Sequence, residues 1–97
     1  MVACEVSADG LTGRGEGTPI YYRGETAEAC VAQLAAWQPH EDRTRLLVEL
    51  PPGAARNALD CALWDLAAQR EGVAVWQLAG LPEPVAVATA YTVSLDT

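Results

Sequence analysis

The first candidates for chemistry are polar and aromatic side chains on a predicted helix in the second half of the chain. They are Arg56, Asp60, Trp64 and Asp65. Charged and aromatic groups gathered on one helix could form a site. A structural role is favoured, because Arg56 and Asp60 stand four residues apart, where an ion pair stabilises a helix by about 0.2–0.5 kcal/mol. We interpret this pair as internal to the helix and Trp64 as a packing residue.

Cysteine and histidine supply nucleophiles and metal ligands in many proteins, but their spacing here favours neither role. The chain has three cysteines, Cys4, Cys30 and Cys61, and one histidine, His40. There is no C-x-x-C pair, and the ligand spacing of a zinc site is absent. Cys30 and Cys61 fall in apolar helical patterns, where a free cysteine behaves as a small buried hydrophobe. We predict core thiols, no metal site in this chain, and a reducing, cytoplasmic environment.

A β-hairpin is predicted at the start of the chain. Residues 2–8 alternate, with Val2, Cys4 and Val6 on one side, as in a half-buried strand. The following Asp9-Gly10 suits a two-residue turn, because both positions tolerate positive φ. Residues 11–17 would then form the return strand.

Three glycines share one face of this return strand: Gly13, Gly15 and Gly17. Glycines in a strand can allow another backbone or a ligand to approach closely, or they can mark a bulged edge. Their spacing does not match G-x-G-x-x-G, so a nucleotide site is not indicated.

Helical patterns dominate the middle of the chain. Thr26 can cap a helix that Pro39 ends. Residues 41–50 are ambiguous between helix and strand; we favour a helix, because Leu46, Leu47 and Leu50 share one helical face. A long apolar helix follows Pro51-Pro52 and stops at Gly72, and a short helix is predicted over residues 75–79.

The end of the chain changes character. Pro82 and Pro84 mark a linker, and residues 85–95 are a near-continuous run of small and β-branched residues. Such runs are typical of strands buried on both faces. The predicted fold class is therefore α+β, with an antiparallel hairpin (an incomplete meander), a helical bundle and a final strand.

Size and composition limit the possible functions. Ninety-seven residues, 51% of them apolar, suit one globular domain. The net charge of −7 argues against nucleic acid and against an anionic membrane as partners, because both would repel the chain. No apolar run approaches the ~20 residues of a membrane span, and no secretory signal pattern opens the chain.

Four segments give the chain a family resemblance. They are Gly15-Glu16-Gly17-Thr18-Pro19, Tyr22-Arg23-Gly24-Glu25-Thr26, Thr89-Ala90-Tyr91-Thr92 and, most specifically, Pro52-Gly53-Ala54-Ala55-Arg56-Asn57-Ala58-Leu59-Asp60-Cys61-Ala62-Leu63-Trp64-Asp65-Leu66. In this order they resemble the amino-terminal capping domain of the enolase superfamily, and its dipeptide epimerase branch in particular. The resemblance implies that residues 1–82 are a capping domain without its first strand. Residues 83–97 would be the linker and first strand of a truncated (β/α)₇β barrel.

The resemblance also implies an activity for the complete enzyme. Members of this branch bind Mg²⁺ in the barrel and epimerise dipeptides such as L-Ala-L-Glu or L-Ala-D-Glu, as part of cell wall peptide metabolism. Two lysines transfer the proton at the α-carbon, and the metal stabilises the enolate. This chain contains no lysine, since all six basic residues are arginines. We therefore expect no catalytic residue and no metal ligand here, and no activity of the chain alone.

Five residues are implied as substrate-binding positions by the resemblance: Thr18, Tyr21, Tyr22, Arg23 and Thr92. The first four fall in a capping loop that faces the active site in relatives, and Arg23 could bind a substrate carboxylate. Thr92 matches a threonine near the end of the first barrel strand. The structural alternatives are a solvated loop arginine and a threonine that merely suits a strand.

Two other functional interpretations stay open. The chain could belong to an N-acylamino acid racemase or an o-succinylbenzoate synthase, which keep the fold and change the substrate. It could also be a stand-alone α+β interaction module. The expected partners are the substrate and the missing barrel of the same protein, and assembly into a homo-oligomer is left open.

Overall fold

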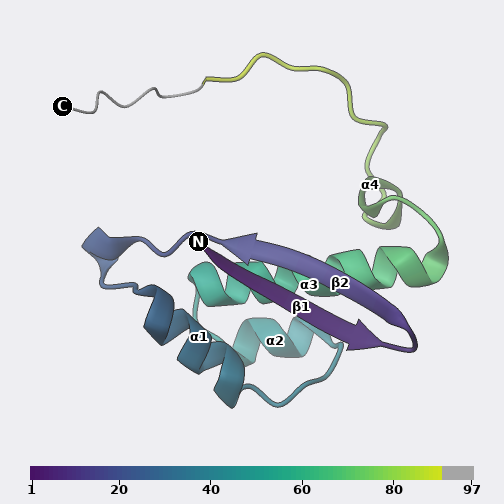
Figure 1. The fold of residues 1–97 in the computed structure, drawn as a ribbon. Helices are drawn as coiled ribbons and strands as arrows, with labels where there is room; N and C mark the ends of the chain where they lie inside the picture. Colours follow the sequence, from purple (N-terminus) through teal and green to yellow (C-terminus); the bar gives the residue numbers. More distant parts are fainter. Residues whose placement is uncertain (91–97) are drawn as a thin grey trace.

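The computed structural model describes residues 1–90, which form an α+β fold (Figure 1). The elements are β1 (Val2–Ala8), β2 (Leu11–Gly17), the 3₁₀ helix η1 (Tyr21–Arg23), α1 (Ala27–Ala36), α2 (Arg43–Glu49), α3 (Ala54–Glu71) and α4 (Val75–Leu78). The two strands lie along α3, and α1 and α2 pack beside them against α3 (Figure 1). The predicted α+β class, with a hairpin followed by helices, is confirmed. No helix within residues 1–90 is long and apolar enough to cross a membrane.

The hairpin has the predicted strands and turn. β1 and β2 are antiparallel, with Val2 opposite Gly17 and Ala8 opposite Leu11. Asp9 and Gly10 have φ of 53° and 78°, which suits the right-handed twist of the strands they join. Val2 is buried and the side chains that alternate with it are exposed, so one face of the hairpin points into the core.

The glycine face of β2 lies directly on the backbone of α3. A Cβ atom on Gly13, Gly15 or Gly17 would occupy the space of the carbonyl oxygen of Ala62, Ala58 or Ala54 respectively. The sequence left open whether these glycines allow a close approach or mark a bulged edge, and the structure shows the close approach of another backbone. Two residues of a strand span about 6.6–6.8 Å and four residues of a helix about 6 Å. The two small-residue rows consequently stay in step over three contacts.

Side chains of α3 also hydrogen-bond the outer edge of β2. Asn57 Nδ2 donates to the Glu16 carbonyl at 3.1 Å, and Gln69 Nε2 donates to the Thr12 carbonyl at 2.7 Å. Asp65 Oδ2 accepts from the Arg14 amide at 2.8 Å. An uncovered strand edge invites pairing with other chains; here the polar face of the helix covers it.

The core consists of two clusters, and both include residues of α3. One contains Val2, Cys30, Ala54 and Ala55, and the other contains Leu46, Leu50, Leu59 and Leu63. Of the three leucines that favoured a helix here, Leu46 and Leu50 are buried, whereas Leu47 is 45% exposed. Cys61 is also exposed rather than in the core, because it lies in the same row of α3 as the polar Asn57 and Asp65.

The predicted Arg56–Asp60 pair does not form. Asp60 instead accepts two hydrogen bonds from Arg43 of α2, at 2.6 and 3.2 Å. The Arg43 guanidinium lies 4.0 Å from the ring centroid of Trp64, an arrangement that combines an ion pair with a cation–π contact. Arg56 donates to the Leu47 carbonyl at the end of α2. Asp60 therefore pairs with Arg43 of the neighbouring helix and not with Arg56 of its own helix. The role of these residues is structural, as predicted.

The helix ends follow the sequence signals. Thr26 Oγ1 accepts from the Ala29 amide at 3.1 Å and caps α1, and Gly72 ends α3 with φ of 67°. Residues 43–49 are helical, as favoured, and α4 matches the predicted short helix.

The predicted final strand is not found in the part of the chain that the structure describes. Residues 81–90 are exposed and form no strand, and the remaining residues, 91–97, lie outside the described residues. A strand requires a hydrogen-bonded partner, and β1 and β2 pair with each other. The continuation into a barrel stays a prediction.

Replacing Gly15 by alanine tests the contact between β2 and α3. The new Cβ would overlap the Ala58 carbonyl and lie 2.7 Å from the Ala62 amide nitrogen. We expect Gly15→Ala to lower the free energy of unfolding by about 1–3 kcal/mol, the usual cost of overpacking. Urea unfolding followed by tryptophan fluorescence measures this. The control Glu16→Ala changes an exposed neighbour and should stay within about 0.5 kcal/mol; equal effects of the two changes would contradict the contact.

Candidate functional site

The loop between β2 and α1 carries four of the five predicted site residues. We call residues 18–24 the tyrosine loop. Its centre is η1, which is closed by backbone hydrogen bonds from the Arg23 amide to the Ile20 carbonyl and from the Gly24 amide to the Tyr21 carbonyl, both 3.0 Å. Gly24 ends the turn with φ of 81°, a conformation that glycine adopts at little cost. The sequence thus builds a short turn that is closed by backbone hydrogen bonds.

The tyrosine loop presents its aromatic side chains to solvent. Tyr21 and Tyr22 are 85% and 74% exposed, and their rings meet edge to face with centroids 5.6 Å apart. Large aromatic side chains that stay exposed on a fixed turn can contact a ligand through an apolar ring and a hydroxyl group. Thr18, at the start of the loop, is exposed as well.

Arg23 differs from the other five arginines. The side chains of the other five each form ion pairs or hydrogen bonds with carboxylates or carbonyl groups. Within residues 1–90, no hydrogen bond or ion pair is found for the Arg23 guanidinium. A guanidinium binds a carboxylate through two parallel hydrogen bonds. Arg23 is therefore the arginine of the described region that is most available for an anionic ligand.

Glu25 fixes the base of the tyrosine loop. Its Oε2 accepts from the Ile20 amide at 2.7 Å, and its Oε1 accepts from the Ala54 amide, the first residue of α3, at 2.8 Å. These backbone hydrogen bonds, Ala54 first and Ile20 second, lower the pKa of Glu25 below its ordinary value. The carboxylate therefore stays charged at neutral pH and caps α3 from a distant part of the sequence.

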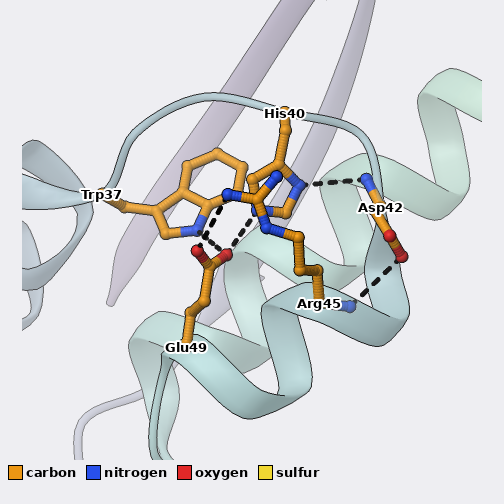
Figure 2. Close-up of polar contacts among 5 residues, drawn as sticks. All are labelled: Trp37, His40, Asp42, Arg45 and Glu49. Atoms are coloured by element: carbon orange, nitrogen blue, oxygen red, sulfur yellow. Dashed lines mark hydrogen bonds and ion pairs between the residues drawn. The ribbon is translucent and has the colours of Figure 1, made fainter.

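A second polar cluster joins the loop after α1 to α2 (Figure 2). Glu49 accepts hydrogen bonds from His40 Nε2, from Trp37 Nε1 at 3.3 Å and from Arg45 at 3.4 Å. His40 Nδ1 accepts from the Asp42 amide at 3.1 Å. The hydrogen bond from His40 is the main cause that lowers the pKa of Glu49. Both imidazole nitrogens are thus engaged, so this cluster serves as a structural joint.

Other chemical groups of the described region do not assemble into a site. Among residues 1–90, no three His, Cys, Asp or Glu side chains come together to hold a metal ion. Burial, with a smaller contribution from Glu5, raises the pKa of the Cys4 thiol, which disfavours the reactive thiolate. A groove of about 420 Å³ lies between β1 and α1, and none of the predicted site residues lines it.

The structure brings together four predicted residues and leaves one untested. Thr18, Tyr21, Tyr22 and Arg23 lie on one exposed loop, whereas Thr92 lies outside the described residues. Sequence reasoning missed the role of Glu25. A signal was present, because Pro51-Pro52-Gly53 precedes a long helix without offering it a capping side chain.

Comparisons with known proteins assign this fold to a family. The family described as mandelate racemase / muconate lactonizing enzyme, N-terminal domain, matches residues 1–80. L-Ala-D/L-Glu epimerase of Escherichia coli (strain K12) is 43% identical over the whole chain, and an N-acetyl-D-glutamate racemase of a Pseudoalteromonas species is 31% identical. The chain spans about a third of the length of these curated relatives, 32% in each case.

Solved structures agree with the sequence relatives. An L-Ala-D/L-Glu epimerase structure superposes on 84% of the chain with a TM-score of 0.80 and 42% identity, and the match covers 27% of that protein. An enolase family member from Agrobacterium tumefaciens with homology to dipeptide epimerases, solved with bound sodium and L-Ala-L-Glu, matches 82% of the chain. Its TM-score is 0.69, its identity is 36%, and the match covers 26% of it.

The chain belongs to the mandelate racemase / muconate lactonizing enzyme family and has the fold of its N-terminal domain. Its two curated relatives are an epimerase and a racemase, and both of these enzymes are isomerases. The predicted resemblance to dipeptide epimerases is confirmed at the level of sequence and fold.

Replacing Glu49 by glutamine tests the joint in Figure 2. The pKa of Glu49 is lowered in the folded state, so its charge stabilises the protein above the unfolded-state value of about 4.3. This stabilisation is lost as the pH falls through the lower, folded-state pKa. We expect Glu49→Gln to lower the urea midpoint at pH 7 and to approach wild type at low pH. Glu16→Gln is the control, because the Glu16 side chain forms no hydrogen bond within residues 1–90. A Glu49→Gln effect that is independent of pH would contradict the joint.

Proposed function

We propose that this chain is the capping domain of an epimerase that inverts the α-carbon of an N-acylated glutamate, with L-Ala-L-Glu as the leading substrate. The observation that carries the proposal is the match to L-Ala-D/L-Glu epimerase along the whole chain, at 43% identity. The relative solved with L-Ala-L-Glu supports the same substrate.

The names of the two curated relatives share one chemical group. L-Ala-D/L-Glu and N-acetyl-D-glutamate both contain a glutamate whose α-nitrogen carries an acyl group. Such a substrate is anionic, and a guanidinium on a capping loop is suited to bind one of its carboxylates. Arg23 is the residue of this chain that we propose for that contact, with Tyr21, Tyr22 and Thr18 beside it and Thr92 contributing from the following segment.

The proposed task of this chain is binding and enclosure. Closing a cap over a substrate excludes water, and water exclusion strengthens the electrostatic interactions within the site. The resemblance to the family implies that Mg²⁺ would supply Lewis-acid stabilisation of the enolate and that lysines would supply the acid and the base. Because this chain has no lysine and residues 1–90 offer no metal cluster, we place both in the remainder of the protein.

One alternative substrate is favoured by a specific observation. The 31% identity to an N-acetyl-D-glutamate racemase suits an N-acylamino acid racemase, the runner-up substrate class. That enzyme would use the same carboxylate contact and differ in the group attached to the substrate nitrogen.

The protein encoded by the whole reading frame around this chain allows a direct test. We expect it to exchange the glutamate α-proton of L-Ala-L-Glu for deuterium in D₂O with Mg²⁺, followed by ¹H NMR. N-acetyl-glutamate distinguishes the alternative substrate, and the 97-residue chain alone is the matched control. Exchange with neither compound would refute the proposal, and exchange by the chain alone would refute the placement of the catalytic groups elsewhere.

Replacing Arg23 by alanine tests the carboxylate contact in that protein. Hydrogen bonds to charged groups contribute about 1.5–3 kcal/mol, so KM should rise roughly 10- to 100-fold. The value of kcat should change less than about threefold, because Arg23 would bind the substrate and the transition state alike. Arg45→Ala removes an arginine of α2 as the control. An unchanged KM for Arg23→Ala would refute the contact.

A further inference from the structure

We infer that Glu25 is a positioning residue for substrate binding: its carboxylate holds the tyrosine loop on the amino terminus of α3, and this attachment sets the place of Arg23. The inference depends on the proposed function for its effect on substrate. Its structural basis is independent of that function.

Glu25 connects two segments that are distant in the sequence. One oxygen accepts from the Ile20 amide at 2.7 Å, and the other accepts from the Ala54 amide at 2.8 Å. The Glu25 amide donates in return to the Ile20 carbonyl at 3.2 Å. The loop is therefore closed at its base by a reciprocal pair of hydrogen bonds and is attached to α3 by the same carboxylate.

The amino terminus of α3 is shaped to receive this carboxylate. Gly53 precedes the helix and offers no capping side chain. A Cβ on Gly53 would lie 2.5 Å from Glu25 Oε1, so the carboxylate uses the space that a side chain would need. A negative charge at the first turn of an 18-residue helix is also favoured by the helix dipole.

No other side chain performs this attachment in the described region. Within residues 1–90, the hydrogen bonds found for the tyrosine loop are those inside η1, those with Glu25, and none with another helix. The aromatic side chains of the loop are exposed and add no anchoring contact. Without the Glu25 carboxylate, the Ile20 and Ala54 amides would both lose this partner, and the loop would lose its hydrogen-bonded attachment to α3.

Glu49 provides a matched control. It is also a glutamate that accepts several hydrogen bonds and has a lowered pKa, but it joins α2 to the loop after α1, away from Arg23. A general loss of stability would appear in Glu49→Gln as well as in Glu25→Gln. A displaced substrate contact would appear in Glu25→Gln only.

The experiment uses the protein of the whole reading frame and two measurements. For Glu25→Gln we expect KM for L-Ala-L-Glu to rise at least 10-fold with kcat changed less than threefold. Hydrogen exchange of the hydrogen-bonded amides of Ile20, Arg23, Gly24 and Ala54 should become at least 10-fold faster. Glu49→Gln should change neither. If Glu25→Gln does not fold, Glu25→Asp carries the test, because it keeps the charge but is one methylene too short to reach both amides.

The two measurements separate this inference from the proposed function. If the wild-type protein does not act on L-Ala-L-Glu but Glu25→Gln still shows faster hydrogen exchange, the attachment is supported and the proposed substrate is refuted. Unchanged exchange and unchanged KM in an active protein would overturn the role of Glu25. Equal losses in Glu25→Gln and Glu49→Gln would also overturn it, since they would reduce Glu25 to a general structural residue.

Discussion

The contact between the glycine face of β2 and the backbone of α3 determines much of this structure. With Gly13, Gly15 and Gly17 in place, the strand lies close enough for the α3 side chains Asn57, Asp65 and Gln69 to reach its edge. Because Gly17 lies against Ala54, the strand ends at the first turn of α3. The loop that follows β2 therefore begins beside the amino terminus of that helix, within reach of Glu25. The position of the candidate site is thus a consequence of the packing distance.

Local features of the fold could be predicted from the sequence, because each depends on neighbouring residues. The Asp9-Gly10 turn, the Thr26 cap and the Gly72 stop are of this kind. Features that depend on distant residues could not. The sequence predicts an ion pair between Asp60 and Arg56 of the same helix, whereas in the structure Arg43 of another helix binds Asp60. Glu25 caps a helix that begins 29 positions later, and no pattern within either segment specifies that partner.

The charges of the chain bear on the proposed binding of an anionic ligand to an acidic domain. The net charge is −7, so the overall field repels a carboxylate. Four arginines are occupied by contacts that join structural elements, and Arg45 pairs with Glu49 of its own helix, which leaves Arg23 as a local exception in the described region. Close, bidentate interactions outweigh a diffuse field that is screened within about 8 Å at physiological salt. Binding in such a setting depends on geometry more than on net charge.

The glycine face of β2 also constrains how this sequence can change over evolutionary time. The atoms that a new Cβ would meet are main-chain atoms of α3, principally the carbonyl oxygens of Ala54, Ala58 and Ala62. Every amino acid carries those atoms, so no second substitution in α3 could create room for a larger residue in β2. A clash between two side chains can be relieved by a compensating change, but this one cannot. Variation at the three positions would need the whole helix to move away from the strand, and the site at its amino terminus would move with it.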